Sequence, residues 1–213
     1  MNGQLFSLDL ASDLILASAS PRRQQFLQEL GLPYTVMTSP TREDKPKHGE
    51  DAQSYTARAA RDKAQAVVSL IPKAETPLIL AADTVVSING HILGKPRDND
   101  EALAMLQLLA GQRHQVTTSV CVLLPGKHNN LSFAFSDEAS VTFYPWSRQV
   151  LEAYVRSGEP LDKAGAYAVQ GKGAFLIQAL QGAWTTVVGL PVGRLCQELL
   201  ARHLIAAQEA KDT

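Results

Sequence analysis

Residues 18–23 read SASPRR and place two arginines directly after a Ser-Pro pair. Ser is favoured just before a helix and Pro at its first position, so this pair predicts a helix start. Arg22 and Arg23 would lie in the first turn, where the helix macrodipole disfavours a cation by about 0.3–1 kcal/mol. A bound phosphate would offset this, because backbone N–H groups, the hydroxyls of Ser18 and Ser20, and both guanidinium groups can contact it. The alternative is a solvated helix face.

Three charged residues are candidates for chemistry near such an anion. Asp83 directly follows the apolar run at residues 78–82 (LILAA), which predicts a carboxylate at the end of a buried strand. Such a carboxylate can hold a metal ion or orient water, or it can cap a turn. Lys63 lies in an alanine-rich segment and Lys95 lies between Gly94 and Pro96. Both lysines are also compatible with solvated positions.

The remaining candidates lie in loops. Glu43 and Asp44 begin a polar stretch at residues 41–51. Gln170 lies in a glycine-rich loop, and its amide carries both a donor and an acceptor, which suits the edge of a nucleobase. Surface positions are the alternative for these residues, and whether Lys172 contacts ligand or solvent stays open.

Two common nucleotide motifs and zinc are excluded. Residues 165–173 (GAYAVQGKG) have one residue too many before Gly-Lys, and Gly173 replaces the Ser or Thr of a Walker loop. A G-x-G-x-x-G motif fails because Leu176 stands at the third glycine. The five histidines are scattered, and neither they nor the two cysteines have the spacing of a zinc site.

Composition narrows the class of protein. The chain has 213 residues, with 20 Lys and Arg against 21 Asp and Glu, so no net field attracts it to nucleic acid or an anionic membrane. Apolar stretches such as residues 117–124 are too short to span a bilayer, and residues 1–13 lack the Lys or Arg of a signal peptide. Cys121 and Cys196 lie in apolar surroundings, typical of reduced core residues. We therefore expect a cytoplasmic protein without membrane or nucleic-acid partners.

The elements that must position these residues alternate between helix and strand. Strands are predicted at residues 14–19, 34–38, 78–82, 116–124, 131–144 and 175–180, with a hairpin at 85–93 around Asn89-Gly90. Helices are predicted at residues 21–30, 52–70, 98–110, 147–156 and 191–205. This order predicts a mixed α/β sheet. One domain is expected over residues 14–205, with an extension at 1–13 of no assigned function and a frayed tail at 206–213.

Five ordered segments resemble a known family: LILASASPRR, AADTVV, GKPRD, LDKAGAYAVQGKGA and VVGLP. Together they are similar to the Maf family of nucleoside triphosphate pyrophosphatases, also described as septum-formation proteins. The resemblance extends from Leu14 to about Leu204. The pair Asp83-Thr84 and the block that ends in Gln170-Gly171 resemble the branch that hydrolyses dTTP and UTP.

The resemblance implies a twisted mixed sheet with flanking helices and two lobes, similar to inosine-triphosphate pyrophosphatase. It implies a homodimer that hydrolyses a nucleoside triphosphate to the monophosphate and pyrophosphate, with Mg²⁺ or Mn²⁺ assisting attack of water on the α-phosphorus. Asp83 matches the proton acceptor and, with Glu43, the metal position. Base selection is implied for Arg22, Thr84 and Gln170, and triphosphate contact for Ser18, Ser20, Arg23, Lys63 and Lys95.

Two other functions stay open at this point. One keeps the reaction but changes the substrate to a purine or modified nucleotide such as 7-methyl-GTP. The other is a non-catalytic nucleotide-binding regulator of cell division. A carboxylate at Asp83 disfavours the second, because like charges repel and a carboxylate beside phosphates indicates a metal ion or chemistry.

Overall fold

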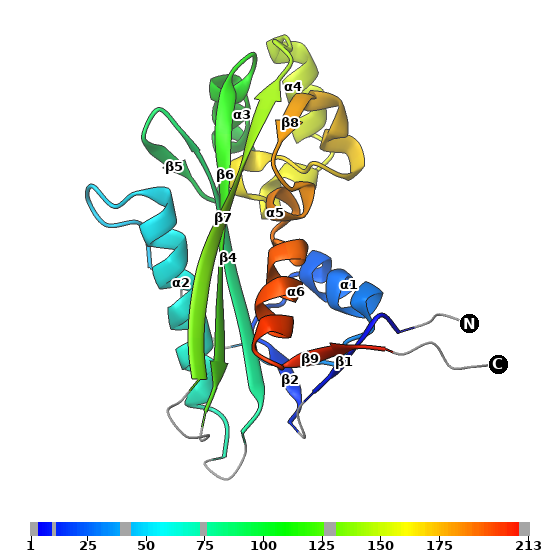
Figure 1. Cartoon of the computed structure of the whole chain (residues 1–213). Helices are drawn as coiled ribbons and strands as arrows, with labels where there is room; N and C mark the ends of the chain where they lie inside the picture. The colour runs from blue at the N-terminus through cyan, green and yellow to red at the C-terminus, as the bar shows by residue number, and fades with distance from the viewer. Residues whose placement is uncertain (1–3, 10–11, 39–43, 73–75, 126–130, 209–213) are drawn as a thin grey trace, which may run out of the picture.

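The computed structural model describes residues 4–9, 12–38, 44–72, 76–125 and 131–208. Within them, a seven-stranded mixed sheet has the order β3-β2-β4-β6-β7-β8, with β5 also paired to β4 (Figure 1). The pairs β2–β3 and β2–β4 are parallel and the other pairs of this sheet are antiparallel. The strands are β1 (Phe6–Leu8), β2 (Leu14–Leu16), β3 (Thr35–Val36), β4 (Leu78–Ile88), β5 (His91–Leu93), β6 (Arg113–Leu124), β7 (Leu131–Phe143), β8 (Ile177–Gln181) and β9 (Ile205–Ala207). The mixed sheet confirms the predicted fold class.

Four of the five predicted helices begin and end within two residues of their predicted bounds. The helices are α1 (Pro21–Leu30), α2 (Ala52–Val68), α3 (Asn99–Leu109), α4 (Arg148–Val155), α5 (Trp184–Val188) and α6 (Val192–Ala201), with 3₁₀ turns η1 (Glu159–Asp162), η2 (Ala164–Ala166) and η3 (Gly171–Leu176). Helix α1 ends at Gly31, whose φ of 76° is the left-handed conformation of a helix C-cap. The side chain of Asp98 accepts a hydrogen bond from the Glu101 N–H (2.8 Å) and caps α3.

The long strands β4, β6 and β7 run through both lobes of the molecule (Figure 1). Side chains alternate between the two faces of a strand, so each strand supplies separate cores. On one face, Leu80 and Val122 pack in a core with α1 and α6, and farther along the same face Val86 and Val116 pack with α3 and α4. The opposite face, including Ile79, packs against α2. The cores with α1 and α6 and with α3 and α4 form the two predicted lobes.

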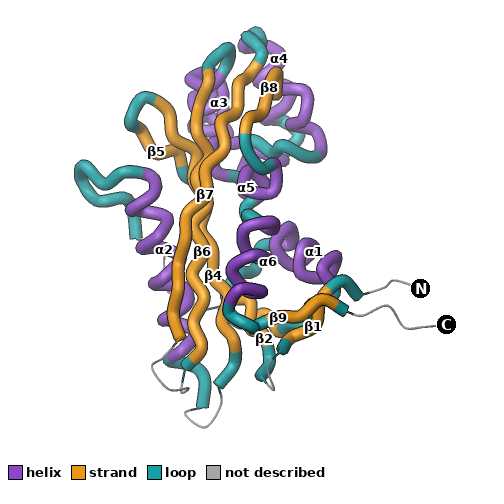
Figure 2. Tube along the Cα trace, in the orientation of Figure 1, coloured by secondary structure: helices purple, strands orange, loops and turns teal. Residues whose placement is uncertain are grey.

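One edge of β4 is interrupted. On that edge β2 pairs with β4 up to Leu80, and β5 pairs with it from Val86 onward (Figure 2). Between them, at residues 81–85, the register of the described strands gives β4 a partner only in β6. A strand edge without a partner leaves room for side chains of both faces to reach one space. Asp83 and Thr84 lie in this interval.

The structure differs from the predicted elements at four places. The last helix, predicted to extend to residue 205, ends at Ala201, because Ile205 pairs in β9 with Leu8 of β1. Strand β4 continues past Asp83 to Ile88, so Asp83 lies within a strand and the prediction of a strand end is wrong. The cause is the pairing of β4 with β6, which includes Asp83 opposite Ser119. The segment before β8 forms η3, and a short helix, α5, precedes α6. The predicted hairpin is confirmed, with Asn89 and Gly90 both at positive φ (50° and 78°), as a type I′ turn requires.

The two ends of the chain pair with each other. Strand β1 is antiparallel to β9, with Phe6 opposite Ala207, and Phe6 and Leu8 also pack against the core with α1 and α6. Ala206 and Ala207 are therefore ordered by pairing, which differs from the expectation of a frayed segment starting at Ala206. None of the helices in the described ranges has the length and apolar character that a membrane span requires.

A buried histidine lies in the lobe with α3 and α4. The Nε2 atom of His114 is 2.9 Å from the hydroxyl of Tyr167, and its ring contacts Phe143 edge-to-face with centroids 4.9 Å apart. His114 is 2 % exposed. Burial lowers the pKa of His114 from 6.5 to about 4, because the charged imidazolium is poorly solvated there.

This histidine predicts loss of stability in acid. Between pH 6.5 and pH 4 the unfolded chain binds a proton at His114 that the native protein does not, so stability rises with pH in this window and falls on acidification. From pH 6.5 to 4.5 we expect His114 to contribute a loss of about 2–3 kcal/mol in the free energy of unfolding. Urea unfolding of the wild type and of His114→Gln measures it, and equal pH slopes in both proteins would contradict the assignment.

Candidate active site

A cavity of about 640 Å³ lies at the interrupted edge of β4. This volume is in the range of small-molecule and cofactor sites. Nine of the ten residues singled out from the sequence line it: Ser18, Ser20, Arg22, Arg23, Lys63, Asp83, Thr84, Lys95 and Gln170. The tenth, Glu43, lies outside the described residues. The structure thus brings together residues from the β2–α1 loop, α2, β4, the β5–α3 loop and the segment before η3.

Asp83 forms an ion pair with Lys63 of α2. The Lys63 Nζ atom donates to Asp83 Oδ1 at 2.6 Å, and the side chains of Asp83 and Lys63 are 8 % and 23 % exposed. A carboxylate this buried needs a partner to remain charged. Lys63 supplies that partner and occupies one of the two carboxylate oxygens.

Arg23 is a buried side chain that holds several elements of the site together. It is 8 % exposed, and all three of its guanidinium nitrogens donate to protein groups. Nε donates to the Gly189 carbonyl (2.8 Å), one terminal nitrogen to Ser18 Oγ (2.9 Å) and the other to Thr84 Oγ1 (3.2 Å). Arg23 therefore joins the β2–α1 loop, β4 and the residue after α5, a positioning role that the sequence did not reveal.

The β2–α1 loop presents hydroxyl groups at the start of α1. Ser20 occupies the N-cap position, as predicted, but within the described residues its side chain makes no capping hydrogen bond. Ser18 Oγ accepts from the backbone N–H of Ser20 (3.3 Å) as well as from Arg23. The free N–H groups of the first turn of α1 and these hydroxyls form the surroundings that bind an anion.

The segment that carries Gln170 is fixed by a carboxylate. Glu159 accepts hydrogen bonds from the backbone N–H groups of Lys172 (2.9 Å) and Gly173 (3.2 Å), at the start of η3. A Cβ at Gly173 would lie 2.5 Å from the Tyr154 hydroxyl, so this position requires glycine. Lys172 itself is exposed and does not line the cavity, whereas the preceding Gln170 does.

The cavity has further charged residues that were not singled out from the sequence. On α2 they are Arg58 and Asp62, which with Lys63 follow a helical spacing that also includes Tyr55, Ala59 and Ala66. That spacing places them on one helix face and was the signal that could have found them. The others are Asp162 and Lys163, and Asp44, a loop candidate from the sequence, also lines the cavity. Among the described lining residues, six cationic side chains face four carboxylates, so the cavity favours an anion.

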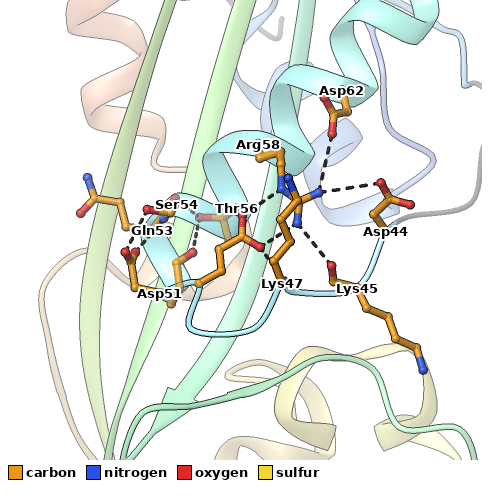
Figure 3. A network of polar contacts seen from close by, with 11 residues as sticks. Asp44, Lys45, Lys47, Asp51, Gln53, Ser54, Thr56, Arg58 and Asp62 are labelled. Atoms are coloured by element: carbon orange, nitrogen blue, oxygen red, sulfur yellow. Dashed lines mark hydrogen bonds and ion pairs between the residues drawn. The ribbon is translucent and has the colours of Figure 1, made fainter.

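Arg58 holds residues 44–50 against α2 (Figure 3). It forms a two-pronged ion pair with Glu50, with nitrogen–oxygen distances of 2.8 and 2.7 Å. A terminal nitrogen of Arg58 also lies 4.0 Å from an Asp44 carboxylate oxygen and 3.9 Å from an Asp62 carboxylate oxygen. The other terminal nitrogen donates to the carbonyl of Lys45 at 3.3 Å. The hydrogen bonds from Arg58 lower the pKa of Glu50 to about 2, so this carboxylate stays charged in moderate acid as well as at neutral pH.

The carboxylates around the cavity determine which kind of metal ion could bind there. No group of three His, Cys, Asp or Glu side chains is gathered as a ready metal site in the part of the chain that the structure describes. Asp83 is a buried oxygen ligand of the kind that Mg²⁺ prefers, and Mg²⁺ in phosphate sites is held by one or two carboxylates together with substrate phosphates. Asp83 fits such an ion, one that is completed by the substrate.

The Arg58 contacts predict how the loop responds to substitution. Glu50 also accepts from the backbone N–H of Lys47 (2.8 Å), so Arg58 restrains the peptide bond that trypsin would cleave after Lys47. Arg58→Lys keeps the charge but loses the two-pronged geometry, and cleavage after Lys47 should accelerate several-fold. Mass spectrometry of timed digests measures this. Arg97→Lys, in an exposed pair with Glu101, is the control, and equal cleavage rates in both variants would refute the role of Arg58.

Known proteins resemble this chain over most of its length. The family model described as "Maf-like protein" matches residues 13–202. Proteins named dTTP/UTP pyrophosphatase are 44 % identical in Nitratidesulfovibrio vulgaris over 93 % of this chain and 91 % of that protein, and 44 % identical in Salmonella typhimurium over 93 % and 96 %. One in Myxococcus xanthus, of the same name, is 46 % identical over 84 % and 87 %. The chain belongs to the Maf family.

Proposed function

We propose that this protein is a nucleoside triphosphate pyrophosphatase that hydrolyses dTTP and UTP to the monophosphate and pyrophosphate. The observation that carries the proposal is the buried Asp83 carboxylate in a cavity whose charged residues are mainly cations. A site for binding alone would gain nothing from a carboxylate beside phosphates. The names of the relatives from N. vulgaris, S. typhimurium and M. xanthus agree with this reaction.

In the proposed reaction, water attacks the α-phosphorus. The bond that breaks joins the α-phosphorus to the oxygen that bridges the α- and β-phosphorus atoms. Lys63 contacts Asp83 Oδ1, so we assign Oδ2 to orient the water and accept its proton. The leaving pyrophosphate gains charge, which Lys95 and Arg22 at the cavity wall are placed to stabilise, together with Ser18 and Ser20. Lys63 and Arg23 contribute positive charge while they hold Asp83 and Thr84 in place.

A divalent cation, Mg²⁺ or Mn²⁺, is part of this proposal. Asp83 would hold it, and the family resemblance implies Glu43 as a second ligand. When bound, the ion would neutralise part of the negative charge of the triphosphate. Base selection is proposed for Arg22, Thr84 and Gln170, of which Thr84 and Gln170 line the cavity from different elements, β4 and the loop before η3.

The cellular location is proposed from the two thiols, and the oligomeric state from the family resemblance. Cys121 and Cys196 are free, and burial raises the pKa of both thiols, which makes them unreactive. Cys121 is buried, whereas Cys196 is only partly buried and so differs from the expected core residue. Free cysteines suit a reducing compartment, and we propose a cytoplasmic location. A homodimer is proposed on the resemblance alone.

The proposed chemistry predicts the effect of Asp83→Asn. The amide cannot accept the proton, so kcat should fall by about 10²–10⁴. The measurement is pyrophosphate release from dTTP, UTP, CTP, ATP, GTP and 7-methyl-GTP with Mg²⁺ or Mn²⁺. The matched control is Asp62→Asn, which makes the same change at a 61 % exposed carboxylate of the cavity rim and should alter kcat less than threefold.

Each result has a distinct meaning. Release from dTTP and UTP that is lost in Asp83→Asn, with an unchanged circular dichroism spectrum, supports the proposal. An Asp83→Asn variant with wild-type kcat would remove Asp83 from the chemistry. Release from purine or methylated nucleotides instead would keep the reaction and replace the substrate. Nucleotide binding without release from any of them would indicate a binding protein.

A further inference from the structure

The Thr84 hydroxyl at the cavity is hydrogen-bonded to a second, buried hydroxyl on the neighbouring strand. Thr84 Oγ1 lies 2.9 Å from Thr118 Oγ1, on the neighbouring strand β6, where the two residues are direct cross-strand partners. Thr118 Oγ1 in turn donates to the backbone carbonyl of Thr186 in α5, at 2.7 Å. Thr118 is 0 % exposed, so water cannot substitute for either contact.

The direction of these hydrogen bonds follows from proton counting. A hydroxyl has one proton to donate, and a carbonyl oxygen can only accept. The single proton of Thr118 is used on the Thr186 carbonyl, so in the Thr84–Thr118 contact the proton must come from Thr84. The Thr84 oxygen also accepts from Arg23 (3.2 Å).

Thr84 is left with only an acceptor to offer. Its proton points to Thr118 and one lone pair faces Arg23, which leaves one lone pair for a ligand. Space for a ligand at this oxygen is preserved by Gly189, since a Cβ there would lie 3.3 Å from Thr84 Oγ1. Thr84 also lines the cavity.

We propose that Thr118 is a positioning residue that makes the Thr84 hydroxyl an obligate acceptor toward the nucleobase, and so favours bases with an N–H at the contacting edge. Uracil and thymine carry such a proton at N3. Cytosine has a lone pair at N3, which would face the lone pair of Thr84. Two acceptors in contact in a closed site are strongly disfavoured, because neither finds a donor. This inference rests on the proposed function.

The test compares UTP and CTP in variants of Thr118. In the wild type we expect kcat/KM for UTP to exceed that for CTP by at least about tenfold. Thr118→Val keeps the side-chain shape but removes the hydroxyl, so the Thr84 proton loses its fixed acceptor and can turn to cytosine N3. The UTP/CTP ratio should then fall about tenfold, mainly through KM, because the base contact already exists in the bound substrate.

Thr118→Ser is the matched control, since it keeps the hydroxyl and removes only a methyl group. It should retain the wild-type ratio within about twofold. An unchanged ratio in Thr118→Val, or an equal loss in both variants, would overturn the proposal. The second result would show that packing, and not the proton, sets the preference.

A measurement on the wild type covers the case in which Thr118→Val does not fold. In 3-deaza-UTP a C–H replaces N3–H, so its kcat/KM should lie at least about tenfold below that of UTP. Equal turnover of the two would overturn the acceptor role of Thr84. Wild-type protein that hydrolyses UTP and CTP equally would overturn the inference and leave the proposed function standing, whereas no release from any nucleotide would remove both.

Discussion

The site depends on the interval in which β4 has no partner on one edge among the strands that the structure describes. Strands β2 and β5 pair with its two ends and leave residues 81–85 uncovered on that side. The other edge of the same interval is paired with β6, so the backbone stays extended and rigid while one side is open. Asp83 can therefore be fixed as part of a core strand and still line a cavity. A loop would give the same access with less precise placement.

Two cations, the partly buried Lys63 and the buried Arg23, maintain the geometry of this open edge. Lys63 binds Asp83 from the side of α2, and Arg23 binds Thr84, Ser18 and the Gly189 carbonyl from the other side. Removing one partner from a buried charge is costly, so each of these contacts resists rearrangement of its own side of the cavity. The same cations that give the cavity its attraction for an anion therefore maintain its geometry.

The sequence predicts what short-range signals determine and misses what distant pairing determines. Pro21 and the Asn89-Gly90 turn define their elements within a few residues, and these were predicted correctly. The continuation of β4 past Asp83 depends on β6, more than thirty residues later in the chain, and Arg23 reaches a carbonyl 166 residues away. The order of the motifs identified nine cavity residues, although the bracing role of Arg23 required the fold.

Asp83 and Thr84 are neighbours in the chain, yet their side chains leave β4 on opposite faces, toward α2 and toward α5 respectively. With the roles proposed above, bond cleavage at Asp83 and base preference at Thr84 would be supported by separate sets of packed residues. Substitutions around Thr84 would then alter which base is accepted without disturbing the surroundings of Asp83. Such a division lets one scaffold diversify in specificity during evolution while its hydrolytic centre is inherited unchanged.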